Sequence, residues 1–222
     1  MFLSIPAVLT AAELSHLRAI AARTTFVDPK KSSALVSPLK NNRWVADPEA
    51  LRQSAQLIGD ALFRSEDFRT FAFPKAMMPP VLTRYDEGMH YGIHVDSALM
   101  TTGQRVLRSD LSCTVFISGE SDYDGGALRI GLGSSDIRIK GKAGSAIVYP
   151  STTIHEVEPV TRGTRLVATT FIESRIADGE QRDLLYELME IGAIAGEGMD
   201  IKTYTRLQRV QQNLLRRWGD PD

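Results

Sequence analysis

The stretch from residue 111 to residue 160 constrains the fold more than any other, because short apolar runs alternate there with glycine-containing turns. Strands are expected at residues 111–117, 127–130, 137–140, 145–149 and 154–160. Turns are expected at residues 122–126 and 141–144. Short strands at close and regular spacing are typical of a β-sandwich or jelly roll. The sequence therefore predicts a mainly β core.

Helices are expected on both sides of this core. Thr10 and Glu13 have the spacing of a capping box and predict a helix over residues 10–23. Residues 47–64 predict a second helix, which opens with an Asp-Pro pair suited to an N-cap and a first helical position. The last part of the chain predicts a helix that begins after Asp178 and is broken by Gly192, Gly196 and Gly198, and then a final helix, both from apolar residues at helical spacing.

The segment from residue 28 to residue 48 is interrupted by prolines and is expected to be rich in loops. Within it, the run Lys40–Trp44 carries more hydrogen-bonding groups than a plain linker requires. Two interpretations stay open: the run lines the mouth of a substrate site, or it forms a surface turn. Asn42 is the candidate substrate-binding residue of this run.

A His-x-Asp sequence at His94 and Asp96 indicates a metal site. Side chains two positions apart on a strand point to the same side, so both can bind one ion. His155 follows within the β-rich stretch, which can return it to this pair. Two histidines and one carboxylate on one side of a metal form the facial triad of non-heme Fe(II) oxygenases, which leaves positions open for a co-substrate and oxygen. Of the other histidines, His16 is interpreted as an exposed helix residue and His90 is left out of the metal site.

Residues 97–110 follow the metal pair and show no periodicity, so they are expected to form a loop. A loop in this position is suited to a lid or a substrate clamp. Arg105 and Arg108 in this loop either contact an acidic group of a substrate or are simply solvated.

The segment 164–172 is rich in Val, Ile, Phe and Thr and predicts a strand. Alternation places Arg165 on the same face as Val167, Thr169 and Phe171. A guanidinium that points inward must be paired to be tolerated. A carboxylate bound through two hydrogen bonds satisfies it, so Arg165 is a candidate carboxylate-binding residue.

The pattern Tyr-x-x-Gly-x-x-Tyr-x-x-His-x-Asp, from Tyr85 to Asp96, resembles that of the prolyl 4-hydroxylase group of Fe(II)/2-oxoglutarate dioxygenases. Within that group the chain resembles the bacterial PKHD-type hydroxylases over nearly all of its 222 residues. The segments that carry this resemblance are residues 5–9, 40–42, 108–112, 123–126, 149–151 and 161–165.

The resemblance implies that His94, Asp96 and His155 bind iron and are the catalytic residues. It implies that Arg165 binds the distal carboxylate of 2-oxoglutarate, at a position where animal prolyl hydroxylases usually have a lysine. Tyr85 is then either a core aromatic residue or a phenol that forms a hydrogen bond with the co-substrate. L-Ascorbate is implied as a further cofactor.

The resemblance also implies the fold: a double-stranded β-helix, which is a cupin-like jelly roll, with flanking helices. The expected divisions are a helical and loop support over residues 1–80, the jelly-roll core over residues 81–176 and a C-terminal helical extension over residues 177–222. We expect the extension to pack on the barrel or on another subunit, and in the second case it forms a homo-oligomer.

The activity that the resemblance implies is hydroxylation of an unactivated C–H bond with release of succinate and carbon dioxide. The substrate stays open between a peptidyl-prolyl residue, a free amino acid and a small molecule connected with iron acquisition. Two other functions also stay open. A zinc hydrolase built on the same three ligands does not need Arg165, and a sensing module binds metal and 2-oxoglutarate without turnover.

Charge and cysteine content exclude several classes of partner and site. The chain has 26 basic and 27 acidic residues and a net charge of −1, so no bulk field attracts nucleic acid or an anionic membrane. No apolar run approaches the roughly 18 residues of a membrane helix. The single cysteine, Cys113, allows no intrachain disulfide and fits a reducing compartment, so a cytoplasmic location is expected.

Overall fold

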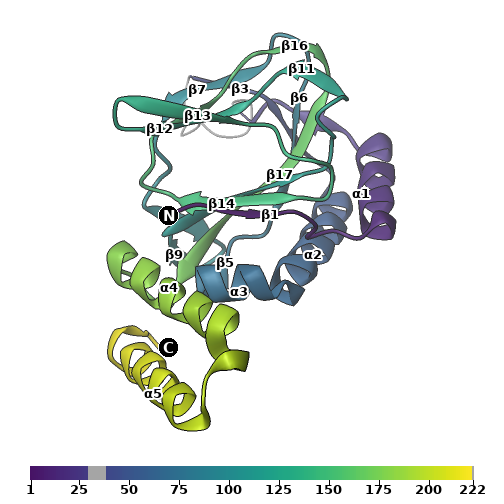
Figure 1. Ribbon diagram of the computed structural model, residues 1–222. Coiled ribbons are helices and arrows are strands. Elements are labelled where there is room, and N and C mark those ends of the chain that lie inside the picture. The colour runs from purple at the N-terminus through teal and green to yellow at the C-terminus, as the bar shows by residue number, and fades with distance from the viewer. Residues whose placement is uncertain (30–38, 222) are drawn as a thin grey trace.

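The computed structural model of the chain describes residues 1–29 and 39–221. Part of the loop-rich segment expected at residues 28–48 therefore lies outside the described residues. Strands and helices follow one another in the order shown in Figure 1. The helices are α1 (Ala11–Arg23), α2 (Pro48–Arg64), α3 (Glu66–Ala72), α4 (Gly179–Ala195) and α5 (Ile201–Trp218), with a short 3₁₀ helix, η2 (Gly196–Gly198), between the last two.

The larger sheet has eight strands, in the order β1-β14-β10-β17-β6-β4-β2, and β5 pairs with β17 outside this path. Its strands are β1 (Leu3–Ile5), β2 (Phe26–Val27), β4 (Arg43–Val45), β5 (Pro74–Met77), β6 (Val81–Tyr85), β10 (Leu111–Phe116), β14 (Ala146–Pro150) and β17 (Arg165–Ser174). The longest, β17, pairs antiparallel with β10 and with β6. The pairing with β6 places Arg165 opposite Tyr85.

The smaller sheet has five strands, in the order β13-β12-β15-β7-β3. Its strands are β3 (Lys40–Asn41), β7 (His90–His94), β12 (Leu128–Leu132), β13 (Ser135–Ile139) and β15 (His155–Val157). The antiparallel pairing of β15 with β7 places His155 opposite His94, although 61 positions separate them in the sequence. Two further antiparallel pairs join β8 (Leu99–Thr102) to β9 (Arg105–Arg108) and β11 (Tyr123–Gly125) to β16 (Val160–Gly163).

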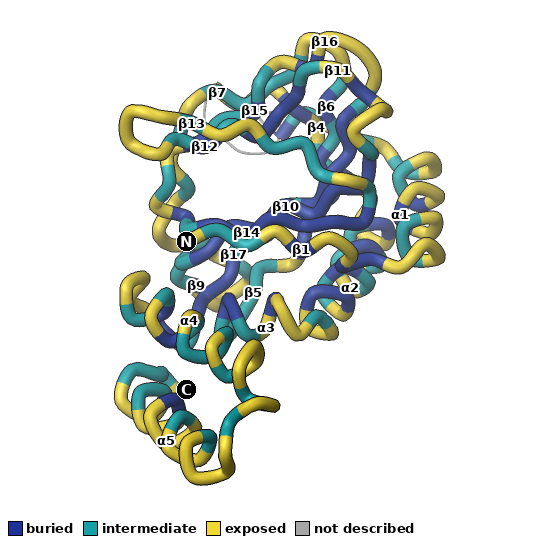
Figure 2. The backbone as a smooth tube through the Cα atoms, in the orientation of Figure 1, coloured by how far each residue is buried: buried dark blue, intermediate teal, exposed yellow. Residues whose placement is uncertain are grey.

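The two sheets form two layers with a hydrophobic core between them (Figure 1). Phe116, Ile147 and Val167 of the larger sheet belong to the same buried cluster as Ile130 and Val157 of the smaller sheet. Figure 2 shows β10 and β17 as buried along most of their length. The expected jelly-roll core is confirmed.

Helices α1, α2 and α3 cover the outer face of the larger sheet (Figure 1). Leu17 of α1, Ile58 of α2 and Phe68 of α3 are fully buried in one cluster with apolar side chains of that sheet. The expected capping box of α1 is present, because Glu13 N donates to the Thr10 hydroxyl and Thr10 N donates to the Glu13 carboxylate. The helices expected at residues 10–23 and 47–64 are therefore confirmed.

The C-terminal helices extend away from the sheets, since α4 packs on α3 and α5 packs on α4 (Figure 1). The break expected at Gly196 and Gly198 is present, because α4 ends at Ala195, but the break expected at Gly192 is wrong, because α4 continues through that residue. A Cβ at Gly192 lies 3.0 Å from Nε2 of Gln211 on α5. The glycine therefore allows a close approach of the two helices and does not end α4.

Two other expectations about local structure are wrong. Residues 97–110 do not form an irregular loop, because β8 and β9 pair from Leu99–Arg108 to Thr102–Arg105 as a hairpin. The single strand expected at residues 154–160 is divided into β15 and β16, which belong to different sheets. In both cases the pairing partner, which the local sequence does not reveal, decides the structure.

Among the described helices, none combines the length and the apolar composition that crossing a bilayer requires.

Candidate metal and co-substrate site

Three side chains that sequence analysis singled out meet at one end of the sheets. His94 ends β7, Asp96 follows it by two positions, and His155 begins β15. Nε2 of His94 lies 3.6 Å from Oδ1 of Asp96, and Nε2 of His155 lies 3.5 Å from Oδ2 of the same carboxylate. One ligand atom from each residue fits within 4.8 Å of the others. Such a group can hold one metal ion.

Hydrogen bonds fix which nitrogen of each histidine faces this centre. Nδ1 of His94 lies 2.8 Å from the carbonyl oxygen of Gly92, and Nδ1 of His155 lies 2.9 Å from that of Thr153. A carbonyl oxygen only accepts, so Nδ1 carries the proton in both rings. The lone pair of each Nε2 is therefore free and faces Asp96, as a metal ligand requires.

The surroundings of Asp96 and His155 favour the protonation states that bind metal. Burial raises the pKa of Asp96, but its interactions with His94, His155 and Ser112 outweigh the effect of burial, so that the pKa is lowered overall. Burial lowers the pKa of His155, against the opposing charge of Asp96. The carboxylate is thus held ionised and the imidazole neutral.

A chain of serine hydroxyls supports Asp96. The Ser112 hydroxyl donates to Oδ2 of Asp96 at 2.6 Å and lies 2.8 Å from the Ser151 hydroxyl. Ser151 in turn accepts a hydrogen bond of 2.8 Å from Ser109. All three serines are buried. Sequence analysis missed them, although Ser112 and Thr114 alternate with apolar residues in β10, which indicates a polar face on a buried strand.

Arg165 presents a different kind of polar group. Its side chain is 1% exposed, and its Nε and Nη1 have no hydrogen-bond partner. Within the described residues no carboxylate forms an ion pair with Arg165. An unpaired buried guanidinium is costly, so this arrangement fits a carboxylate supplied by a ligand.

Tyr85 and Asn42 lie beside this guanidinium. The guanidinium carbon of Arg165 is 4.9 Å from the centre of the Tyr85 ring. The Tyr85 oxygen accepts a hydrogen bond of 2.9 Å from Nδ2 of Asn42, which leaves the Tyr85 hydroxyl hydrogen free to donate. Burial raises the pKa of Tyr85, so the phenol stays protonated. Oδ1 of Asn42 and the Tyr123 hydroxyl are also buried without a partner.

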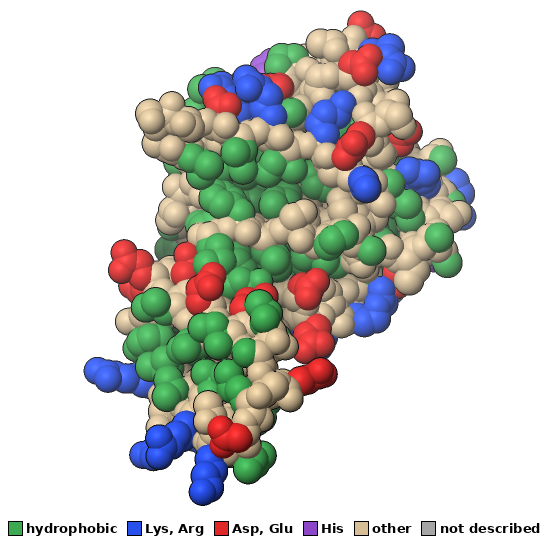
Figure 3. Space-filling view, viewed as in Figure 1, with side chains coloured by type: hydrophobic (Ala, Val, Ile, Leu, Met, Phe, Trp, Pro, Cys, Tyr) green, Lys and Arg blue, Asp and Glu red, His purple; other side chains and the backbone are tan. Residues whose placement is uncertain are grey.

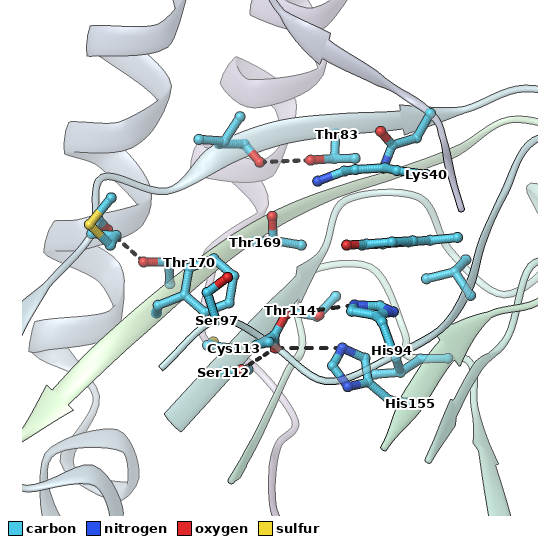
Figure 4. Close-up of a pocket in the computed structure, with 18 of the residues that line it drawn as sticks. Lys40, Thr83, His94, Ser97, Ser112, Cys113, Thr114, His155, Thr169 and Thr170 are labelled. Carbon is cyan, nitrogen blue, oxygen red and sulfur yellow. Dashed lines mark hydrogen bonds and ion pairs between the residues drawn. The ribbon is translucent and has the colours of Figure 1, made fainter. Parts of the chain in front are cut away.

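These groups line one cavity of about 480 Å³, which contains the triad and Arg165 (Figure 4). From the run Lys40–Trp44, the residues Lys40, Asn42 and Trp44 line the cavity. Arg43 instead forms an ion pair of 3.5 Å with Asp86. The interpretation that this run lines the site therefore holds for Lys40, Asn42 and Trp44, which are every second residue of the run.

Arg105 and Arg108 are not among the residues that line this cavity. The Arg108 guanidinium donates to both oxygens of Asp110, at 2.8 and 3.0 Å, and to the carbonyl oxygen of Ser174. Arg105 is exposed on the β8–β9 hairpin. Met100 and Thr101 of that hairpin do line the cavity.

The residues present fit the iron and 2-oxoglutarate that the resemblance implies. Two neutral imidazole nitrogens and one carboxylate are suited to Fe(II) and leave positions open on the cavity side. The two partnerless N–H groups of Arg165 are suited to a carboxylate in the same cavity.

Comparisons with known proteins agree with this arrangement. Residues 80–173 match the family model of the 2OG-Fe(II) oxygenase superfamily. A PKHD-type hydroxylase of Sphingopyxis alaskensis is 53% identical over 202 residues, which cover 91% of this chain and 92% of that protein. A PKHD-type hydroxylase of Thermosynechococcus vestitus is 36% identical over 99% of this chain and 100% of its own length.

Two solved structures illustrate the similarity in fold. A Pseudomonas putida prolyl-4-hydroxylase has a TM-score of 0.53 at 19% identity, covering 78% of this chain and 92% of its own. HygX from Streptomyces hygroscopicus, solved with nickel, 2-oxoglutarate and hygromycin B bound, has a TM-score of 0.55 at 16% identity, covering 78% of this chain and 82% of its own. At these identities the similarity shows the fold alone.

Proposed function

Because the chain belongs to the PKHD-type hydroxylases of the 2OG-Fe(II) oxygenase superfamily and is an oxygenase, we propose that it hydroxylates an unactivated C–H bond with release of succinate and carbon dioxide. The observation that carries this proposal is one cavity that holds both the triad and an arginine with unpartnered N–H groups.

In this proposal His94, Asp96 and His155 hold Fe(II), and Arg165 binds the distal carboxylate of 2-oxoglutarate. Bound Fe(II) and 2-oxoglutarate supply the oxidising chemistry by reductive activation of O₂. The chain supplies ligands in the correct protonation state, a hydrogen bond from Tyr85 to the co-substrate, and walls that exclude water. L-Ascorbate serves as the reductant that restores Fe(II) after unproductive oxidation.

The zinc hydrolase that the sequence left open has no use for the Arg165 end of the cavity. A hydrolase whose substrate has no carboxylate would leave two buried nitrogens of Arg165, Nε and Nη1, without an acceptor. A sensing module would use both the triad and Arg165, but it does not require further space in the cavity for a substrate. The cavity of about 480 Å³ provides such a space.

An anaerobic titration tests the proposal. The metal-free chain is titrated with Fe(II) and then with 2-oxoglutarate, and the weak visible charge-transfer absorption of the chelate is followed. We expect the band in the wild type and no band in His155→Ala. Oxygen is then admitted with candidate substrates, and succinate is measured. No band in the wild type, together with tight zinc binding, contradicts the oxygenase proposal.

We further propose that residues 81–176 form the catalytic core, which contains the metal ligands and Arg165.

We also propose that two copies of the chain associate through the C-terminal helices. Apolar side chains gather over α4 and α5 (Figure 3), and Ile194 and Ile201 are 82% and 75% exposed. Light scattering of the wild type and of Ile194→Asp tests the association. A wild type that stays monomeric at high concentration contradicts it.

A further inference from the structure

One charged side chain of the cavity has no role in the proposed function. Among the described residues, the acidic, basic and histidine side chains that line the cavity are Lys40, His94, Asp96, His155 and Arg165. Four of them are assigned to the metal and to 2-oxoglutarate. Lys40 is left, and in Figure 4 it lies across the cavity from His94 and His155 and is directed towards Thr83.

The fold holds Lys40 in this place through strand pairing and aromatic contacts. Lys40 on β3 lies opposite Tyr91 on β7. Its Nζ is 4.0 Å from the centre of the Trp44 ring and 5.0 Å from that of Tyr91. The Tyr91 ring stacks on His94 with 3.6 Å between ring centres. The ammonium group is thus fixed at one end of a stack that ends at a metal ligand.

The chain does not satisfy the hydrogen-bonding capacity of this ammonium group. Contacts with two ring faces offset its charge but occupy none of its three N–H bonds. Among the described residues no acceptor and no carboxylate pairs with Lys40. Burial lowers the pKa of Lys40 to about 8, against the opposing charge of Asp96. A negatively charged ligand group at this position therefore favours the protonated form of Lys40.

In the proposed function, 2-oxoglutarate does not supply a counter-charge for the ammonium group of Lys40. The charges of Fe(II) and Arg165 are balanced by those of Asp96 and of the 2-oxoglutarate dianion. With both bound, Lys40 is the one charge in the cavity lining that lacks a counter-charge. A carboxylate on a second ligand supplies that charge and an acceptor for the N–H groups.

We propose, on the basis of the proposed function, that Lys40 determines substrate specificity: its ammonium group binds a carboxylate of the molecule to be hydroxylated and holds that molecule across the cavity from the triad. The substrate is therefore a carboxylate, supplied either by a free acid or by an acidic side chain of a peptide. Trp44 and Tyr91 form the walls of this carboxylate site.

The position of Trp44 gives a direct readout of binding. The chain has two tryptophans, Trp44 and Trp218, so a Trp218→Phe chain reports on Trp44 alone. This protein is loaded with Zn(II) and 2-oxoglutarate, so that no turnover occurs. It is titrated with N-acetyl amino acids and with the corresponding N-acetyl amides, while Trp44 fluorescence is followed. A blocked peptide with an internal glutamate, and its glutamine counterpart, test the second source of the carboxylate.

We expect at least one acid to change the fluorescence at a concentration about tenfold or more below its amide. Lys40→Met is expected to remove that preference and Lys40→Arg to retain part of it. Lys202→Met, on the exposed side of α5, is the matched control and is expected to behave as the wild type. Acids and amides that bind alike, or no response to any acid, overturn the proposal.

The affinity for 2-oxoglutarate separates this proposal from the one on which it rests. We expect Lys40→Met to bind 2-oxoglutarate as the wild type does, by the charge-transfer titration. If Lys40→Met loses that affinity as Arg165→Met does, Lys40 belongs to the co-substrate site and the proposal is overturned. If the wild type itself does not bind 2-oxoglutarate, the proposed function fails.

Discussion

The two ends of the cavity differ in how their polar atoms are satisfied. At the triad, Nδ1 of each histidine and Oδ2 of Asp96 have partners within the chain, and only the atoms that face the metal are left open. At the other end, Arg165 has two buried N–H groups without partners. The first end is oriented by the protein before any ligand arrives, and in the proposed function the second is completed by 2-oxoglutarate. Satisfied hydrogen bonds therefore fix the geometry of a site, and unsatisfied buried donors favour a ligand that can accept from them.

The largest effect is expected from Asp96→Asn, which keeps the shape of the side chain and removes its charge. Loss of a supporting residue typically costs about 10- to 100-fold in metal affinity. Loss of a charged ligand is expected to cost more, so Fe(II) affinity falls by more than about 100-fold and turnover is abolished. Anaerobic Fe(II) titration measures the affinity.

Asp136→Asn on β13 is the control, since that carboxylate pairs with Arg129 and Arg138 outside the cavity. It is expected to leave Fe(II) affinity unchanged. If Asp96→Asn binds Fe(II) as tightly as the wild type, the triad is not the metal site.

The second prediction concerns Arg165→Met. Removing one partner of a buried charge pair typically costs about 2–4 kcal/mol, which lowers the affinity for 2-oxoglutarate by about 30- to 1000-fold. The same change is expected to leave the melting temperature of the ligand-free chain equal or higher, because it removes a buried charge without a partner. Calorimetry measures both quantities.

Arg182→Met is the matched control. Arg182 is also buried and its Nε also lacks a partner, but its Nη1 donates to the carbonyl oxygen of Ile176 within the chain, whereas Nη1 of Arg165 has no partner. This variant is expected to lower stability and to bind 2-oxoglutarate normally. An Arg165→Met chain that is less stable but binds 2-oxoglutarate normally shows that Arg165 is structural, and it removes the contrast between the two ends.

The third prediction concerns Ser112→Ala, which removes the hydrogen bond to Asp96. Fe(II) affinity is expected to fall by about 10-fold, because Asp96 loses an orienting partner but remains a ligand. Ser109→Ala, at the far end of the serine chain, is expected to change the affinity only slightly. Equal effects of the two changes contradict the role given to the Ser112 hydroxyl. Both are measured by the same Fe(II) titration.

The residues that meet at the site could be predicted from the sequence because they have few alternatives. The chain has only four histidines, which leaves few candidates for the metal ligands His94 and His155. Arg165 stood out because the alternation of its strand points it inward. The antiparallel register that brings His155 opposite His94 depends on contacts distant in sequence, so only the structure shows it. The capping residues of α1 and α2 were predictable, since a cap is a local interaction.

The parts that could not be predicted depend on partners distant in the sequence. The β8–β9 hairpin has polar residues on both faces, so its periodicity is weak. Helix α3 has seven residues, which is too short for a clear helical pattern. Gly192 is a residue type common at helix ends, but a single glycine is also tolerated inside a helix, so the sequence alone does not decide that α4 continues through it.

The smallest effect is expected outside the cavity, where an arginine has its carboxylate within the chain. Arg64 donates to both oxygens of Glu13 at 2.9 Å, the opposite case to Arg165. The hydrogen bond with Arg64 lowers the pKa of Glu13 from 4.5 to about 2. A lowered carboxyl pKa contributes stability that is present above about pH 4.5 and is lost as the pH falls through about 2. The Arg64–Glu13 pair is partly exposed and therefore screened by solvent. Glu13→Gln is therefore expected to lower the melting temperature at pH 7 by only about 1–2 °C. The difference from the wild type should shrink below about pH 4.5. A difference that stays constant down to pH 3 shows that the charge of Glu13 does not cause the effect, and it removes the contrast between an arginine paired by the chain and one left for a ligand.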